Sequence, residues 1–296
     1  MKPITYCMPV PTESAEARRE TLRTYADNGI SHIVLSSTLL EHFMVVPDDI
    51  AAFETDMRDC GISFMDAHAP WGTWKDPGVP FEEQHELIVL RHRMALHICN
   101  HFGVTSIAYH TANTFNHIYG KHLVIDDYYQ MLIRSMTELL PDAERHGVVM
   151  ALENQWTPLN QSAYLLKAAQ HFNSQWVGIC YDAGHGNLTE HGNEFPGQTC
   201  VPGIWQDIGL PVVWEEQFIE KVRPYIVNCH LHDNNGIIDQ HNLPGNGTVD
   251  WKRIMAILAN APRLQCIQSE VSMGKTDAPS IPELVKSFSD LLDLNP

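Results

Sequence analysis

Basic residues are scarce in this sequence, and they form no block. The 296 residues include 19 Lys and Arg against 36 Asp and Glu, so the formal net charge is −17 with histidine neutral. Nucleic acids and anionic membrane surfaces bind clusters of Lys and Arg. We therefore expect that this protein binds neither a membrane surface nor nucleic acid.

Long apolar runs and paired cysteines are also missing. No stretch of about 18 uncharged apolar residues occurs, as a transmembrane helix requires, and Met1–Thr5 turns polar too early for a signal peptide. The seven cysteines are an odd number, lie far apart and form no CxxC pair. This pattern is typical of reduced thiols and predicts a cytoplasmic protein. Assembly into a homo-oligomer stays open.

The chain does contain a regular alternation of short apolar runs and amphipathic segments. The runs are rich in Val, Ile, Tyr and Cys, as are strands buried on both faces. Strands are expected at Thr5–Val10, His32–Ser36, Ile62–Ala67, Ser106–His110, Val148–Glu153, Val177–Asp182, Tyr225–His230 and Gln265–Glu270. Helices are expected at Glu13–Asn28, Pro47–Cys60, Glu82–Phe102, Ile125–His146, Ser162–Phe172, Trp214–Val222, Trp251–Ala259 and Pro279–Leu292.

Eight strand–helix units in a chain of this length predict a single (β/α)8 TIM barrel. No linker rich in Pro, Gly or Ser divides the chain, so we expect one domain over residues 1–296. The alternative, a doubly wound fold, requires a glycine-rich turn after the first strand. The sequence has Pro9-Val10-Pro11-Thr12 there.

Two connections after expected strands are long, Gly186–Val213 and His232–Val249, and a further loop carries Trp71 and Trp74. Long loops after barrel strands usually build the active-site face. These three segments are therefore predicted to wall the active site.

Acidic residues and histidines stand where six consecutive expected strands end. They are Asp66, His68, His110, Glu153, Asp182, His185, His230, His232 and Glu270. Because the carboxyl ends of barrel strands meet at one mouth, these side chains should lie together. Converging carboxylates and imidazoles without a balancing Lys or Arg are what a divalent cation requires.

Each of these residues also has an interpretation without a metal. A carboxylate at a strand end can cap the following helix, and a histidine there can be a core side chain. Asp66 is interpreted as structural, and His232 as a residue that supports the ligands. The joint order Glu, Asp, His and Glu on strands five to eight favours the metal interpretation.

Five segments in this order resemble the xylose-isomerase-like TIM barrels. They are Ala151–Asn154, Tyr181–His185, His230–Asn234, His241–Trp251 and Ser269–Val271. That superfamily contains sugar and sugar-phosphate isomerases and epimerases, dehydratases and the apurinic-site endonucleases. The resemblance spans essentially the whole chain.

The resemblance implies that Glu153, Asp182, His230 and Glu270 bind one divalent ion. Mn²⁺, Zn²⁺, Co²⁺ and Mg²⁺ all suit this mixture of oxygen and nitrogen donors. His185 falls where the family has a substrate-contacting or second-metal histidine. The endonuclease branch binds additional zinc ions, and the counterparts of those ligands are His68, His110, Asp239 and His241. His232 is grouped with these residues as a substrate-binding or second-metal candidate.

The function predicted is a metal-dependent sugar isomerase or epimerase in which Glu153 and Glu270 transfer a proton through an enediolate. The substrate is expected to be a small carbohydrate-like molecule, partly covered by Trp71, Trp74 and Trp156. Few basic residues lie near strands five to eight, which favours an unphosphorylated substrate. Gly236 stands where the ketose epimerases have a substrate-binding arginine, so the sugar class stays open. The alternatives are a multi-zinc phosphoester hydrolase of the apurinic-endonuclease type and a metal-dependent dehydratase.

Overall fold

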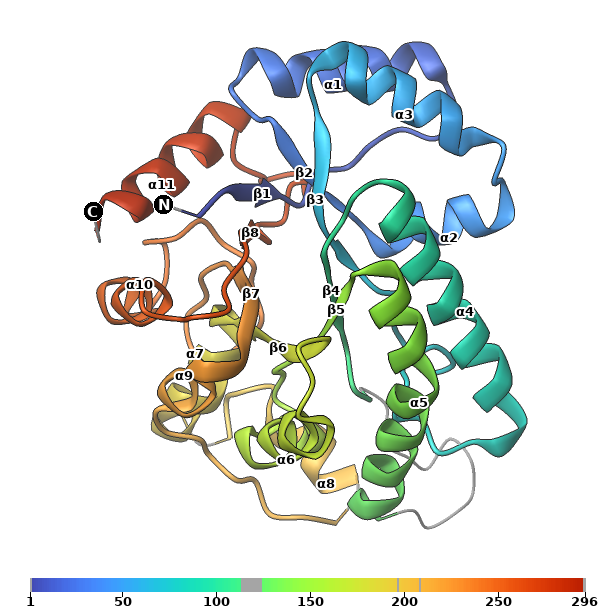
Figure 1. Cartoon of the computed structure of the whole chain (residues 1–296). Coiled ribbons are helices and arrows are strands. Elements are labelled where there is room, and N and C mark those ends of the chain that lie inside the picture. Colours follow the sequence, from blue (N-terminus) through green and yellow to red (C-terminus); the bar gives the residue numbers. More distant parts are fainter. Residues whose placement is uncertain (1, 113–123, 196, 208, 295–296) are drawn as a thin grey trace.

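The strands close into one parallel barrel, as predicted. The structure is a computed structural model and describes residues 2–112, 124–195, 197–207 and 209–294. Eight strands follow one another around the barrel in chain order, and helices surround them (Figure 1). The ring closes where β1 pairs with β8, with Thr5 opposite Gln268. The predicted (β/α)8 fold is confirmed.

The strands lie close to their expected positions. They are β1 Ile4–Tyr6, β2 His32–Leu35, β3 Ser63–His68, β4 Ser106–Tyr109, β5 Val149–Glu153, β6 Val177–Asp182, β7 Ile226–Leu231 and β8 Ile267–Ser269. β1 is shorter than the apolar run that predicted it. Pro9, within that run, has no backbone N–H to donate to a neighbouring strand.

The helices are α1 Ala15–Asp27, α2 Ser37–Val45, α3 Asp49–Cys60, α4 Glu82–His101, α5 Ile125–His146, α6 Ser162–Phe172, α7 Ala183–His191, α8 Pro202–Asp207, α9 Phe218–Val222, α10 Trp251–Leu258 and α11 Ile281–Asp293. α5 and α6 have the predicted bounds. α3 and α5 end at Gly61 and Gly147, which adopt the left-handed backbone conformation with φ of 69° and 70°. α9 begins later than the expected Trp214.

The prediction of a long loop over Gly186–Val213 is wrong. α7 starts directly after β6 and takes up the beginning of that segment, and α8 lies further along it. Asp182 caps α7, because its Oδ1 accepts a hydrogen bond of 2.7 Å from the His185 backbone N–H. The connection His232–Val249, in contrast, contains no helix or strand, as expected.

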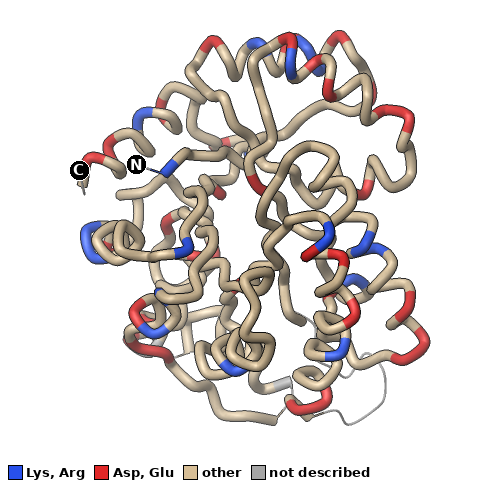
Figure 2. The backbone as a smooth tube through the Cα atoms, viewed as in Figure 1, with Lys and Arg blue, Asp and Glu red and all other residues tan. Residues whose placement is uncertain are grey.

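Charged side chains lie mainly on the surrounding helices. In the view of Figure 2, Lys and Arg residues appear on several separate helices and form no continuous stripe. Among the described residues, no helix combines the length and the hydropathy of a membrane span.

Candidate metal centre and active site

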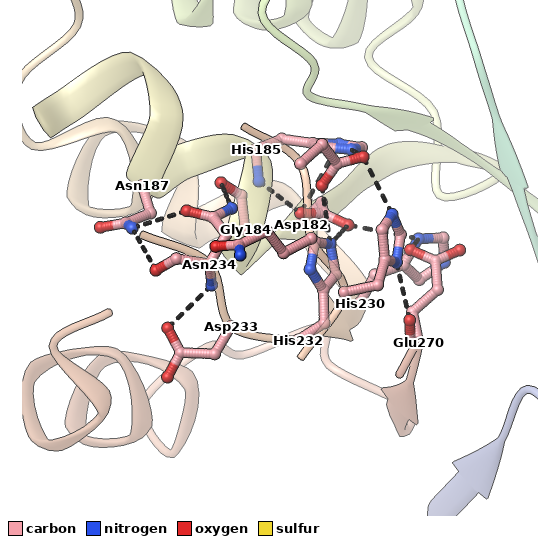
Figure 3. Close-up of polar contacts among 12 residues, drawn as sticks. Asp182, Gly184, His185, Asn187, His230, His232, Asp233, Asn234 and Glu270 are labelled. Atoms are coloured by element: carbon pink, nitrogen blue, oxygen red, sulfur yellow. Dashed lines mark hydrogen bonds and ion pairs between the residues drawn. The ribbon is translucent and has the colours of Figure 1, made fainter. Parts of the chain in front are cut away.

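Four side chains from neighbouring strands meet at the carboxyl end of the barrel. Glu153 ends β5, Asp182 ends β6, His230 lies on β7 and Glu270 follows β8. One ligand atom from each lies within 4.8 Å of the others. His230 Nδ1 is 3.3 Å from Glu270 Oε2 and 3.5 Å from Glu153 Oε1. Figure 3 shows His230 between the acidic side chains of this group, which we call the four-ligand group.

The donor atoms of the four-ligand group are buried, and several form no hydrogen bond. Glu153, Asp182 and His230 are at most 1% exposed. Glu153 Oε2 and both ring nitrogens of His230 form no hydrogen bond. Burying such polar atoms without partners is unfavourable. A divalent cation would satisfy them, because mixed carboxylate and imidazole sets are its usual ligands. The residues present therefore fit a metal ion.

Two further histidines approach the same glutamate. His68 at the end of β3 and His110 after β4 each place Nε2 3.4 Å from Glu153 Oε2. Their rings meet edge to face, with centroids 4.8 Å apart. His68 Nδ1 lies 2.9 Å from the carbonyl oxygen of Ala69, so it is the nitrogen that carries the proton. His68 Nε2 faces the Glu153 carboxylate; burial lowers the pKa of His68, but the charge of Glu153 outweighs burial and raises this pKa.

A third group of potential ligands adjoins the first. His185, His232, Asp239 and His241 also offer donor atoms within 4.8 Å of one another. Asp239 Oδ2 is 2.9 Å from His241 Nε2 and 3.6 Å from His185 Nε2. The rings of His232 and His241 stack with centroids 3.8 Å apart. We call these four residues the accessory group.

Charge pairing controls protonation in both groups. Burial raises the pKa of Glu153, but His230 and His110 outweigh it and hold this pKa well below its ordinary value. Burial raises and His230 lowers the pKa of Glu270, with a net shift downward. Burial lowers the pKa of His241, yet Asp239 and Glu270 raise it to about 9. Both glutamates are therefore ionised at neutral pH, and a bound metal would displace protons from histidines.

A cavity of about 480 Å³ opens above these residues. Trp71 and Trp156 line it, and Trp71 is 50% exposed. Their rings lie 5.2 Å from the His110 ring and 5.0 Å from the His185 ring, measured between centroids. Trp74 is not among the lining residues. No Lys or Arg occurs among the described residues that line the cavity.

Comparison with known proteins identifies the family of this barrel. The family model for the xylose isomerase-like TIM barrel matches residues 22–272. The chain belongs to the xylose isomerase-like TIM barrel family.

Several members of this fold are similar over nearly the full chain. A D-tagatose 3-epimerase-like protein superposes with a TM-score of 0.72 and 18% identity, covering 99% of this chain and 98% of that one. The IOLI protein with a bound zinc atom has a TM-score of 0.68 and 17% identity, covering 99% and 98%. An uncharacterised protein, y4fM, of Sinorhizobium fredii is 26% identical over 251 residues, which are 83% of this chain and 64% of that protein. This chain thus spans less than two thirds of the length of y4fM.

The site also contains residues that the sequence interpretation missed. Cys7, Ser36 and Gln155 line the cavity. Cys7 and Ser36 directly follow β1 and β2. They were missed because the search at the strand ends considered only acidic residues and histidines. Asn154 was quoted only as part of a motif, yet its side chain binds the Asp182 backbone twice. Its Nδ2 donates to the Asp182 carbonyl at 2.9 Å, and its Oδ1 accepts from the Asp182 N–H at 2.7 Å.

The loop that carries the accessory group is held by two side chains after β7. Asp233 accepts hydrogen bonds from the Trp251 indole N–H at 2.8 Å and from the Gly245 backbone N–H at 2.8 Å. Asn234 Nδ2 donates to the Gly184 carbonyl oxygen at 2.8 Å, which ties the loop to α7 (Figure 3). These bonds bring Asp239 and His241 back over the barrel mouth.

Proposed function

We propose that this protein is a divalent-metal-dependent isomerase or epimerase of a sugar or related polyol-type substrate. One observation carries the proposal. Two ionised glutamates, Glu153 and Glu270, face the same buried histidine from different strands at the floor of a cavity lined by tryptophans. This arrangement supplies two proton carriers around one binding place.

Glu153, Asp182, His230 and Glu270 are the residues that would hold the metal. When bound, a divalent ion stabilises negative charge on adjacent carbonyl and hydroxyl oxygens and so acidifies the C–H between them. Asp182, one of these four residues, is held in place because Asn154 bonds its backbone and because its own carboxylate caps α7.

The two glutamates differ in a way that suits different sides of a substrate. The Glu153 side chain is 1% exposed, whereas that of Glu270 is 17% exposed. We assign one as the base that removes the carbon-bound proton and the other as the acid that returns one. Return to the neighbouring carbon is an isomerisation, and return to the opposite face of the same carbon is an epimerisation. Loss of a β-hydroxyl from the same intermediate would be a dehydration.

The cavity wall favours an uncharged substrate. Phosphate recognition requires Lys, Arg or helix N-terminal amides, and the described lining contains no Lys or Arg. Trp71 and Trp156 offer flat apolar surfaces, and the polar atoms lie on the floor. A monosaccharide has both kinds of surface, with C–H groups on its ring faces and hydroxyls at its rim.

A second candidate, a multi-zinc phosphoester hydrolase, is favoured by the accessory group together with His68 and His110. The accessory group and the group of His68, Glu153 and His230 adjoin the four-ligand group, which gives three potential ligand groups, and His110 approaches Glu153 as well. The metal count per chain separates the two functions, since the isomerase requires one ion and the hydrolase requires three.

The deciding experiment combines metal analysis with exchange of substrate protons. Metal content is measured for the wild type, His230→Gln, His241→Gln and the control His101→Gln, whose residue is ion-paired with Glu54 on the outer surface. An isomerase loses its metal in His230→Gln alone, whereas a trinuclear hydrolase also loses one equivalent in His241→Gln.

Turnover in D₂O tests the proton transfer itself. The sugars tested are ketoses and aldoses without phosphate, and the product is examined for deuterium on carbon. Proton transfer through a glutamate places solvent deuterium on the carbon beside the carbonyl. Rapid turnover with no carbon-bound deuterium would rule out the two-glutamate mechanism.

A further inference from the structure

A layer of polar side chains lies inside the barrel directly beneath the candidate metal centre. It consists of Thr5 on β1, Asp66 on β3, Asn228 on β7 and Gln268 on β8, and we call it the polar layer. Each member stands two positions before a residue of the site, namely Cys7, His68, His230 and Glu270. Because side chains alternate between the faces of a strand, each pair points to the same side. The polar layer therefore faces the barrel axis, one step below the site.

The members of the polar layer are fully buried and lack direct partners. All four are 0% exposed. Thr5 Oγ1, both carboxylate oxygens of Asp66 and both amide atoms of Asn228 and Gln268 form no hydrogen bond. Barrel interiors are usually filled by branched apolar residues. A polar layer at this depth is unfavourable for packing alone, since buried polar groups require partners.

Ordered water is the partner that suits the polar layer. Buried waters bind where several polar groups converge, and each typically bridges about three of them. Thr5 and Gln268 are neighbours in register across β1 and β8, and Gln268 is the neighbour of His230 across β8 and β7. Thr5, Gln268 and His230 thus follow one another in register, and this polar path ends at a proposed metal ligand.

His230 is the ligand that needs an outer partner. Its Nδ1 faces the carboxylates of the four-ligand group, and its Nε2 is buried without a hydrogen bond. A histidine that binds a metal through one nitrogen usually donates its other ring N–H to an acceptor, which fixes the ring and strengthens it as a ligand. Asp66 is the one carboxylate of the polar layer. Burial raises its pKa to about 6, and the charge of the His230 ring, followed by the Thr5 hydroxyl, opposes this rise.

We propose that Asp66 is a positioning residue for His230, accepting the ring N–H that the metal leaves free through water held by Thr5, Asn228 and Gln268. The inference rests on the proposed metal site and adds a role for the carboxylate beneath it. Asp66 touches neither metal nor substrate in this arrangement. It acts by orienting His230 and by raising the basicity of its ring.

The test replaces the carboxylate by an amide of the same shape. Asp66→Asn should weaken divalent metal binding by about 10–100-fold, the loss typical of an outer-shell partner. Zn²⁺ and Co²⁺ affinities are measured by competition with a chromophoric chelator, and the visible spectrum of the Co²⁺ protein reports the ligand geometry. Thermal stability without metal should stay unchanged or rise, because an uncompensated buried charge has been removed.

The matched control is Asp56→Asn. Asp56 is also a buried aspartate, but it pairs with Arg18 at 2.6 Å between α1 and α3, away from the site. Its loss should lower the melting temperature and leave the metal affinity unchanged. Opposite responses of stability and affinity in the two variants would distinguish positioning from a structural role.

The outcomes separate this inference from the proposed function. A wild-type protein that binds no divalent metal would overturn the metal site and with it the role of Asp66. A wild type that binds metal, with an Asp66→Asn affinity within twofold of it, would overturn the inference alone. If Asp66→Asn does not fold, Thr5→Val decides. Removal of this water-binding hydroxyl should weaken metal binding several-fold, and an unchanged affinity would refute the water path.

Discussion

The Asp239–His241 pair predicts that the metal-free protein loses stability at alkaline pH. The ordinary pKa of histidine is 6.5. Burial lowers the pKa of His241, but Asp239 and Glu270 outweigh burial and bring it to about 9. A folded-state pKa above the unfolded one stabilises the fold fully below pH 6.5. This contribution falls as the pH rises and is lost above pH 9 or so. Raising the pKa of His241 from 6.5 to about 9 stabilises the fold by roughly 3 kcal/mol, at about 1.36 kcal/mol for each pKa unit.

The assay is urea unfolding of chelator-treated protein between pH 6 and pH 10, for the wild type and His241→Gln. Glutamine can still donate to the Glu270 carbonyl oxygen, which His241 Nδ1 contacts at 2.7 Å, but it carries no proton to lose. The wild type should lose on the order of 3 kcal/mol more than the variant over this range. Asp239 stays ionised throughout, because its pKa is shifted downward. Equal losses in both proteins would refute the charge pairing.

Three further predictions concern the site directly. Asp182→Ala should lose the metal and about 1 kcal/mol of stability from the α7 cap. Asp182→Asn should weaken metal binding but keep the cap, and metal analysis and urea unfolding check both variants. Glu153→Gln and Glu270→Gln should keep measurable metal yet lose roughly 10²–10⁴-fold in rate, the range of general acid–base catalysis, and full activity in either would remove that residue from the chemistry. Gly184→Ala should lower the free energy of unfolding by roughly 1–3 kcal/mol, because the added carbon would lie 2.0 Å from His232 Cε1. Calorimetry measures the melting temperature, and an unchanged value would contradict the close contact between Gly184 and His232.

The positions of the strand ends could be predicted because each strand is a short run of consecutive apolar residues. β6 has the bounds read from its apolar run, and the residues at its end and at the end of β5 meet as the barrel geometry requires. α7 was missed because Gly184 and Gly186 are poor helix formers. The structure explains one of them, since the His232 ring lies against Gly184. The Asp182 cap was the signal that could have outweighed the glycines.

Two members of the accessory group, Asp239 and His241, could not be predicted from the periodicity of the sequence. Asp239 and His241 lie in a connection without helix or strand, so no repeat in the sequence reports where they point. Their position depends on Asp233 and on its bonds to residues up to 18 positions away along the chain. Loop length placed the connection at the barrel mouth, but only the family resemblance singled out these two residues within it.

Glu153 and His230 each belong to two of the potential ligand groups, the four-ligand group and the one completed by His68. Two ions bound there would share donor atoms, so their binding free energies could not be independent. Each ion would change the affinity of the other by the same factor, because such coupling is reciprocal. Stepwise metal titration of this barrel should therefore yield macroscopic constants that describe the cluster as a whole. The same sharing would make a single substitution at Glu153 alter every one of those constants at once.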